Sequence, residues 1–317
     1  MSTPEAQILK QFEAAEAAPV PAGTAAAPGL TGTLRSYLAL TKPRLLPMVL
    51  LTAIPTMLMA AGGWPPAYLM FTTILGTALA AGAANTLNCF AERERDALMT
   101  RTATRPLPTG RLTPRQALCF GVALAAVSTL LLLAATNVLA AAIALSGILF
   151  YVFVYTIWLK PRTPYSTVIG GAAGAIAPLI ADAAVDGRVG PAGLLIFLIV
   201  FFWQPPHFWA ISLYRKDEYA HAGFPMLPLV IGEDATRLRM LLYTFLLVPV
   251  TLAPVALGLL GTAYLAAALP LGALFIGAAL RVRKHKTAAS ARTMFRVSLL
   301  YLLLLFVAML ADLTIAA

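Results

Sequence analysis

The feature that most constrains this chain is a series of apolar stretches, each about as long as a bilayer is thick. A helix needs about 20 apolar residues to cross roughly 30 Å of hydrocarbon. Apolar residues make up 60% of the chain and charged residues only 11%, which excludes an ordinary soluble domain. We therefore predict an all-α integral membrane protein with nine transmembrane helices. The nine stretches are 45–62, 67–90, 116–135, 137–158, 165–184, 190–213, 238–260, 262–280 and 294–316.

Lysine and arginine gather on one side of this arrangement. With nine spans, the segments that precede the odd-numbered spans share a side, and of 23 Lys and Arg residues only Arg188 falls on the other. Basic residues concentrate on the cytoplasmic side of membrane proteins. We therefore predict a cytoplasmic N-terminus and a periplasmic C-terminus. Orientation also explains the net charge of +10 without a nucleic-acid partner.

The first part of the chain differs from the rest. Residues 1–36 are rich in Ala, Pro, Gly and Thr, and they lack the apolar core of a signal peptide. Their acidic residues argue against a mitochondrial transit peptide. We predict a disordered cytoplasmic tail over 1–36 and a polytopic domain over 37–316, in a bacterial inner membrane. Cys89 and Cys119 are too few for a disulfide framework and are interpreted as packing residues.

A basic, proline-containing segment occurs twice, as LTKPRLL around Lys42 and as WLKPRTP around Lys160. These lysines are 118 residues apart, and Asp217 follows Asp96 by 121 residues, so each copy continues with two spans and an acidic loop. Chance is the alternative, because Pro and Lys are common before membrane helices. Four spans per unit would give both copies the same orientation, with both acidic loops on one face of a central cavity. The predicted units are two parallel four-helix repeats at about 40–158 and 159–280, followed by a ninth helix at 294–316.

The first acidic loop, NCFAERERDALMTRTATRPLP, packs acids and bases between two apolar spans. Asn88, Glu92 and Asp96 recur every four residues, so on a continuous helix they share one stripe, with Asn85 near it. Carboxylate and amide oxygens suit Mg²⁺ together with substrate phosphate. The alternative is a solvated loop whose charges fix only the topology. The acids favour a site, because topology depends on Lys and Arg.

The same stretch contains two pairs of arginines with different expected roles. Arg93 and Arg95 are expected to point away from the acidic stripe. Arg101 and Arg105 lie in a looser segment, and guanidinium groups match the oxygens of phosphate. Acids for a metal followed by bases for phosphate are what a diphosphate–Mg²⁺ complex requires.

A second acidic loop, YRKDEYAHAGFPMLP, follows the sixth span. It carries Asp217 and Glu218 beside Lys216, with Tyr214 and Tyr219 on either side. Two loops with acids and bases on one membrane face favour a shared site over a pair of solvated loops.

Two stretches of spans five and six are unusual for membrane helices. The small residues of GGAAGAIAP either let helices approach closely or leave room for a ligand. The double proline of WQPPHFW is expected to break the backbone hydrogen-bond ladder, which is tolerated only where other protein or a cavity is present. His207 in this motif is interpreted either as a donor between helices or as part of an aromatic cavity. Such a cavity could hold a flat ring system or stabilise a carbocation.

These motifs identify a known family. The chain resembles the UbiA superfamily of intramembrane prenyltransferases and, within it, the branch that modifies heme. The resemblance rests on AANTLNCFAERERDALMTRTATRPLPTG, LKPRTPYSTVIGGAAGAIAPLI, WQPPHFWAISLYRKDEYAHAGFPMLP and MFRVSLLYLLLLF, which are spread over 38–306. It implies transfer of the farnesyl group of farnesyl diphosphate to the 2-vinyl group of heme b. Water addition would then give heme O and diphosphate, with Mg²⁺ as the cofactor.

The resemblance also implies roles for particular residues. Asn88, Glu92 and Asp96 would form the first metal motif, although many members carry Asp at the position of Glu92. Asp217 and Glu218 match the second motif loosely, so which of them meets metal through diphosphate stays open. Substrate contacts are implied for Lys42, Arg44, Asn85, Arg101, Arg105, Lys160, His207, Tyr214, Lys216 and Tyr219. A heme A synthase or cytochrome oxidase assembly factors are implied as partners.

Two other functions fit parts of the sequence. Another branch of the superfamily, acting on a quinone precursor or a chlorin, would share the metal motifs and lack the heme-branch stretches. A secondary transporter would place its ion site near mid-membrane. The acids of this chain argue against transport, because Asp182, Asp186 and Asp312 fall near the outer ends of spans and the others cluster at one face.

Overall fold

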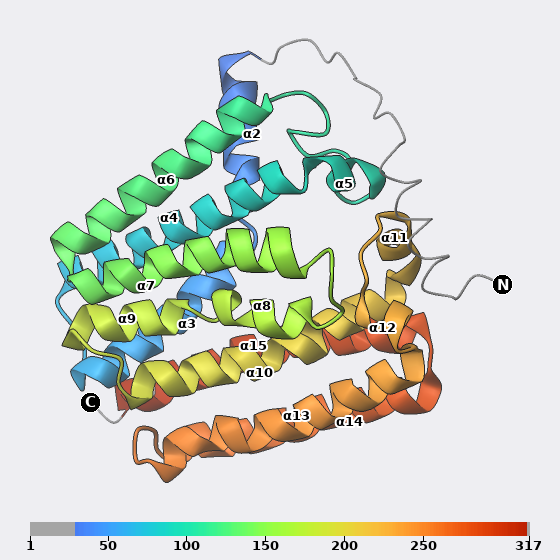
Figure 1. Cartoon of the computed structure of the whole chain (residues 1–317). Helices are drawn as coiled ribbons and strands as arrows, with labels where there is room; N and C mark the ends of the chain where they lie inside the picture. Colours follow the sequence, from blue (N-terminus) through green and yellow to red (C-terminus); the bar gives the residue numbers. More distant parts are fainter. Residues whose placement is uncertain (1–28, 316–317) are drawn as a thin grey trace.

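The computed structural model describes residues 29–315, a range that contains helices and turns and no strand. Within it, eight helical segments are long and apolar enough to cross a membrane (Figure 1). They are α4 (Ala67–Ala91), α6 (Pro114–Ala135), α7 with η1 (Val138–Leu159), α8 with α9 (Ser166–Asp186), α10 (Pro191–Tyr214), α13 (Glu233–Ala256), α14 (Thr262–His285) and α15 (Ala288–Ile315). The prediction of an all-α membrane protein is confirmed.

The first apolar stretch forms a shorter helix, α3 (Leu46–Ala61), of 16 residues. At 1.5 Å per residue it measures about 24 Å, which is less than the hydrocarbon thickness. Gly62 ends it in the left-handed conformation, at φ 63°. The remaining helices are short and lie between the long ones: α2 (Leu30–Leu40), α5 (Arg93–Leu98), α11 (Lys216–His221) and α12 (Leu227–Val230).

The long helices surround a common interior. α4 packs on α6, α7 on α9, and α10 on α13, while α3 contacts both α9 and α15 and so joins the early and late parts of the chain. α13 and α14 lie together along one side, next to α10 and α15 (Figure 1). The loops that carry α5 and α11 lie at one end of this bundle (Figure 1).

Two helices begin earlier than the apolar pattern predicts. α13 begins at Glu233 instead of residue 238, because acidic residues in a first turn stabilise the positive end of the helix dipole. α15 begins at Ala288 instead of residue 294. Apolar composition marks the part of a helix that lies in lipid and misses the polar turns that extend beyond it.

The predicted tail over 1–36 lies mostly outside the described residues, and its last part is helical. α2 begins at Leu30, so residues 30–36 belong to a helix and the prediction of disorder is wrong for them. Tyr37 packs edge-on against Phe120 of α6, and Leu40 is buried beside Cys89. Tyr37 and Leu40 follow the predicted tail, and their contacts anchor α2, which extends back into residues 30–36. Both cysteines are free; Cys89 is buried and Cys119 is exposed.

Two spans are irregular near their middle. α7 continues into a π-helix, η1 (Phe150–Leu159), and α8 (Ser166–Gly174) is separated from α9 (Ala177–Asp186) by a turn. A Cβ at Gly170 would come within 2.1 Å of the Tyr155 ring, and one at Gly174 within 2.5 Å of Oε1 of Gln204. The small residues of GGAAGAIAP therefore let α8 approach its neighbours closely.

The double proline does not interrupt α10. Helix runs through Pro205 and Pro206, although proline has no N–H to donate to the carbonyl four residues earlier. Both prolines are buried, and Gln204 beside them donates to the carbonyl of Gly171 at 2.7 Å. α10 packs against α8 and α15, which provide the protein surroundings in which the loss of these ladder bonds is tolerated.

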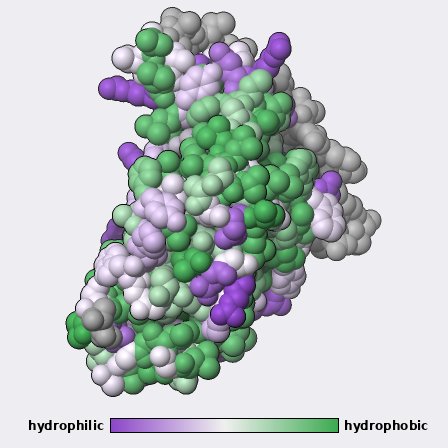
Figure 2. All heavy atoms as spheres, turned by 90° about the vertical axis from the view of Figure 1, so that its left-hand side faces the viewer, coloured by the Kyte–Doolittle hydropathy of each residue, from purple (hydrophilic) through white to green (hydrophobic). Residues whose placement is uncertain are grey.

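Buried acids at the end opposite α5 and α11 accept from backbone. Oδ2 of Asp182 accepts from the N–H of Gly190 at 2.6 Å and of Gly193 at 3.0 Å, at the first turn of α10. Asp312 accepts from Gly261 and from Tyr264 at the start of α14. The first turn of a helix has N–H groups without partners inside the helix, and these carboxylates satisfy them. Viewed from this end, the surface shows broad apolar areas with few hydrophilic side chains (Figure 2).

Candidate active site

The first acidic motif lies where α4 ends. The helix stops at Ala91, Glu92 adopts a non-helical conformation, and α5 begins at Arg93. The backbone still bonds at a spacing of four, from Glu92 N–H to the carbonyl of Asn88 and from Asp96 N–H to that of Glu92. The continuous helix expected over these residues is therefore interrupted at Glu92, and the motif divides between α4 and α5.

All three motif side chains are buried at the mouth of the bundle. Asn88, Glu92 and Asp96 expose 2, 7 and 4% of their surface. Carboxylates are almost never buried to this extent unless they are paired. Each member of the motif has a basic partner.

Three basic side chains from different parts of the chain supply those partners. Lys42 donates to Oδ1 of Asn88 at 2.7 Å. Lys160 forms an ion pair with Glu92, and Arg105 forms one with Asp96 at 2.5 Å. Lys160 follows η1 and Lys42 follows α2, so both lysine-proline segments reach the motif.

Asn88 also holds the π-helix. Its Nδ2 donates to Oγ1 of Thr156 at 3.1 Å, and this hydroxyl donates to the carbonyl of Tyr151 at 2.8 Å. Tyr151 and Tyr155 lie on the same helix with ring centroids 5.2 Å apart. π-helical turns are rare and often occur at functional sites. Here the π-helix places an aromatic pair beside Asn88.

The backbone at Lys42 is in the left-handed region, with φ 53°. For a residue with a Cβ this conformation costs about 1–2 kcal/mol. Lys42 closes α2 at a position where glycine is the usual residue. A lysine here is consistent with selection for its ammonium group at the expense of backbone strain.

Charge partners decide the protonation of the buried pair. Burial raises the pKa of Glu92, but Lys160, Lys42 and Arg105 together outweigh it, and the pKa lies below its usual value. Burial lowers the pKa of Lys160, and Glu92 more than reverses this. Glu92 and Lys160 are therefore both charged at neutral pH. Lys42 lacks a carboxylate in direct contact, and burial lowers the pKa of its ammonium group.

The donor atoms of the motif match the preference of Mg²⁺. Two carboxylates and an amide oxygen lie on a short segment, and hard divalent cations favour such oxygens together with substrate phosphate. Across residues 29–315, no three His, Cys, Asp or Glu side chains form a cluster that could hold a metal by itself. The residues fit a metal that arrives with a diphosphate, because such a ligand also gives the three bases an alternative anion.

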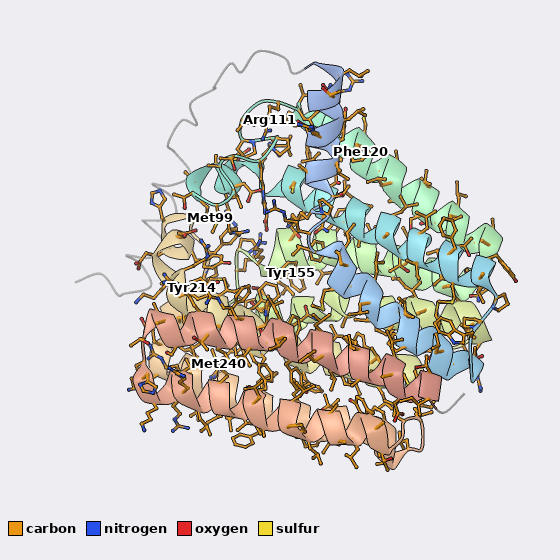
Figure 3. All side chains as sticks on the ribbon, turned by 180° about the vertical axis from the view of Figure 1, so that it is seen from behind. Met99, Arg111, Phe120, Tyr155, Tyr214 and Met240 are labelled. Atoms are coloured by element: carbon orange, nitrogen blue, oxygen red, sulfur yellow. The ribbon has the colours of Figure 1, made fainter. Side chains whose placement is uncertain are left out.

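The loops of α5 and α11 meet through apolar and aromatic side chains. Met99 is buried in one cluster with Tyr219 and Phe224. The Phe224 ring also lies under two cations, with Lys160 Nζ at 4.7 Å and the Arg95 guanidinium at 5.1 Å from its centroid. Arg95 therefore joins the two loops. Met99 and Tyr214 lie toward the same end of the bundle (Figure 3).

Tyr214, Lys216 and Asp217 face a separate cleft. They line a cavity of about 270 Å³ with the ends of α13, α14 and α15. Lys216 pairs with Glu233 at 2.7 Å. Glu218 instead pairs with Arg215 at 2.7 Å. Within the described range, neither Asp217 nor Glu218 bonds to the first motif, so the loops converge through Tyr219 and not through their acids.

Three predicted contact residues near the first motif, Arg44, Arg101 and Asn85, do not bond to Asn88, Glu92 or Asp96. Arg44 and Arg101 are exposed and form no ion pair within the described part of the chain. Asn85 donates to the carbonyl of Thr41 at 3.1 Å and so fixes the turn before Lys42. Asn85 was predicted to contact substrate because it lies near the stripe of motif residues. In the structure it instead holds the backbone turn that positions Lys42.

A family model described as the UbiA prenyltransferase family matches residues 49–310. The chain belongs to this family. Curated relatives include a protoheme IX farnesyltransferase of Symbiobacterium thermophilum, 49% identical over 89% of this chain and 95% of its own length. Another, from Acidiphilium cryptum, carries the same name and is 48% identical over 89% of this chain and 92% of its own.

Solved structures show the UbiA fold for this chain. A digeranylgeranylglyceryl phosphate synthase superimposes with a TM-score of 0.75 at 20% identity, over 89% of this chain and 98% of that one. A UbiA homolog from Archaeoglobus fulgidus, solved with DMAPP and Mg²⁺, gives a TM-score of 0.59 at 18% identity, over 86% and 99%.

In this prenyltransferase His207, a predicted substrate contact, lies apart from the acids, between α10 and α15. It is buried on α10, and Nδ1 lies 2.7 Å from Oγ of Ser298 on α15. Thr156 and Ser298 were both missed by the sequence analysis. A hydroxyl residue in an apolar span gives no signal of its partner, which lies 68 residues away for Thr156 and 91 for Ser298.

Proposed function

We propose that this UbiA prenyltransferase transfers the farnesyl group of farnesyl diphosphate to the 2-vinyl group of heme b. Water adds in the same reaction, and the products are heme O and diphosphate. Relatives named protoheme IX farnesyltransferase, matched over most of both chains, support the choice of substrates. The observation that carries the proposal is the buried motif in which Asn88, Glu92 and Asp96 each pair with a basic side chain.

The bases prepare the site for a diphosphate. Lys42, Lys160 and Arg105 neutralise the motif in the absence of substrate, and each can turn toward a phosphate oxygen when one arrives. The motif oxygens of Asn88, Glu92 and Asp96 would then hold Mg²⁺, which would stabilise the negative charge of the leaving diphosphate.

Ionisation of the C–O bond leaves an allylic cation and diphosphate. The Tyr151 and Tyr155 rings beside Asn88 present faces that stabilise a cation, and the apolar interior excludes premature water. The vinyl group supplies an electron pair to the farnesyl carbon, water adds to the resulting cation on the heme, and one proton leaves. Asp217, an acid of the second motif, lines the neighbouring cleft.

We further propose that α3 completes nine spans in two parallel repeats, with the N-terminus cytoplasmic in a bacterial inner membrane. Lys42 and Lys160 support the repeat, since equivalent positions 118 residues apart reach one motif. A cysteine introduced at position 188 should react with a membrane-impermeant thiol reagent added from the periplasmic side. Transfer of heme O to a heme A synthase or an oxidase assembly factor fits the product.

The experiment that tests the function is heme extraction and mass analysis from cells with and without this protein. Expression should add one species heavier than heme b by a farnesyl group and a hydroxyl group. An unchanged heme profile, together with a prenylated quinone or chlorin, would replace heme b as the acceptor and leave the family assignment intact.

A further inference from the structure

His207 is the buried titratable group that the carboxylate site does not use. Its ring lies between Trp203, with centroids 4.4 Å apart and planes at 23°, and Phe295, at 4.9 Å and 33°. Phe208 meets it edge-on at 5.4 Å. Aromatic rings thus hold both faces of the imidazole and fix the plane in which its nitrogens lie.

A hydroxyl group on α15 determines which nitrogen carries the proton. Ser298 has one hydroxyl hydrogen, and it donates to the carbonyl of Phe295 at 2.7 Å. The Ser298 oxygen therefore accepts from Nδ1–H of His207 at 2.7 Å. The Trp203 indole N–H donates to the Ser298 carbonyl at 2.8 Å, which fixes the same turn of α15. With its proton on Nδ1, the neutral ring presents a lone pair at Nε2.

That lone pair has no protein partner. Nε2 of His207 makes no hydrogen bond with any residue of 29–315, while 8% of the side chain remains accessible. Nε2 is not one of the fully buried polar atoms without a partner in that range, so it remains accessible to a ligand. Within residues 29–315 the ring contacts aromatic side chains and the Ser298 hydroxyl and has no charged partner, and the neutral imidazole is the form that binds a metal.

We propose that Nε2 of His207 is an axial ligand to the iron of the heme substrate and that Ser298 is its positioning residue. The inference rests on the proposed heme substrate. A donor that fixes the tautomer and an aromatic pair that fixes the plane are what a histidine ligand to heme iron requires. His207 lies two turns, about 10 Å, along α10 from Tyr214 at the charged end. The iron would thus be held deeper than the diphosphate.

The test uses full-length protein in nanodiscs with added heme b. The ferrous complex of the wild type should show an iron–histidine stretch in its resonance Raman spectrum. His207→Ala should lose this band, and added imidazole should restore it. The chain has two other histidines, His221 and His285, both exposed, and His221→Ala and His285→Ala serve as matched controls that keep the band.

The positioning role has its own variant and control. Ser298→Ala should shift the iron–histidine band and weaken heme affinity about 10-fold, the usual scale for loss of a supporting hydrogen bond. Ser212→Ala makes the same chemical change at an equally buried serine of α10 that bonds only to the Trp209 carbonyl, and it should leave band and affinity unchanged.

The outcomes separate this inference from the proposed function. A wild-type protein without an iron–histidine band, or a band retained in His207→Ala, overturns the ligand assignment even when heme O is formed. A band that is present and lost as expected, with no heme O formed from farnesyl diphosphate, leaves the ligand in place and overturns the farnesyl transfer. If His207→Ala does not fold, a band retained in the double variant His221→Ala, His285→Ala comes from the one remaining histidine, and a band lost there overturns the assignment.

Discussion

Two pairs of buried carboxylates lie at opposite ends of the bundle, near α5 and near the starts of α10 and α14 (Figure 1). Glu92 and Asp96 bind the ends of long basic side chains. Asp182 and Asp312 bind backbone N–H groups of first helical turns. All four side chains are carboxylates, and their burial is similar. The partners differ in whether they can move.

That difference separates a site from a structural support. A backbone N–H in a first turn is fixed, so the carboxylate that accepts from it has a permanent partner. A lysine or arginine side chain can rotate toward another anion and leave its carboxylate free for a metal. The acids at the α5 end are thus suited to exchange partners with a diphosphate, while those at the other end join helices.

The largest expected effect is the loss of stability when the Glu92–Lys160 ion pair is broken. Glu92→Gln should lower the free energy of unfolding by about 3 kcal/mol, because it leaves the ammonium of Lys160 buried without its counter-charge. The double variant Glu92→Gln, Lys160→Met should recover much of this loss. Reversible unfolding of the four proteins in detergent measures the coupling, and additive losses would show that the pair does not interact as the structure indicates.

The same pair sets the acid limit of stability. Lys160 holds the pKa of Glu92 below its usual value, so the contribution of this carboxylate is complete above about pH 4.5 and is lost as pH falls through the folded pKa. The difference in unfolding free energy between wild type and Glu92→Gln should therefore be constant from pH 8 to about pH 5 and shrink below it.

The next effect is on turnover. Asp96→Asn should reduce heme O formation about 100-fold, because a ligand of the metal motif loses its charge. Stability should fall as in Glu92→Gln, because Arg105 (22% exposed) is about as buried as Lys160 (17%), so the rate is measured per folded molecule. Glu94→Gln is the matched control, because Glu94 is exposed on the same short helix and pairs only with Arg93. Equal rates for Asp96→Asn and wild type would remove Asp96 from the site.

The acids at the other end should behave in the opposite way. Asp182→Ala and Asp312→Ala should each lower the free energy of unfolding by about 2 kcal/mol, since two N–H groups lose their acceptor. Turnover per folded molecule should stay within about twofold. Asp186→Ala should change stability by less than about 0.5 kcal/mol, as its nearest partner, Arg188, is exposed at 3.7 Å. A large loss of turnover in Asp182→Ala or Asp312→Ala, with stability unchanged, would contradict the assignment of these acids to a structural role.

The smallest expected effect is a shift in pH dependence. Burial lowers the pKa of Lys42, with Arg105 and Lys160 acting in the same direction, so its charge is lost at a lower pH than for an exposed lysine. If its ammonium binds diphosphate, the alkaline limb of kcat/KM for farnesyl diphosphate reports this loss. Lys42→Arg keeps the charge and should move the limb to higher pH. An unmoved limb would exclude Lys42 from that step.

The fold could be predicted from the sequence because the lengths of apolar stretches determine membrane helices almost alone. Interruptions could not be predicted. The turn between α8 and α9 and the stop at Glu92 lie where side chains link different spans, through Gln204 with Gly171 and through Lys160 with Glu92. Pro205 and Pro206 show the converse, since packing keeps a helix that local rules would break.

The site could be predicted as a set of residue types and only partly as a set of contacts. Four-residue spacing identified Asn88, Glu92 and Asp96, and the repeat indicated that Lys42 and Lys160 are equivalent. Which base meets which acid is determined by tertiary packing. The same holds for the second loop, where Asp217 lines the neighbouring cleft and the aromatic residues Tyr219 and Phe224 meet the first loop.

The most direct test of exchangeable partners is a structure of the wild type with Mg²⁺ and the slowly reacting analogue farnesyl thiodiphosphate. The account predicts that Lys160 and Arg105 leave Glu92 and Asp96 and contact phosphate oxygens, while the freed carboxylates face the metal. Asp182 and Asp312 should keep their backbone partners. A bound diphosphate with both ion pairs intact, or one bound only in the cleft beside Asp217, would contradict the account.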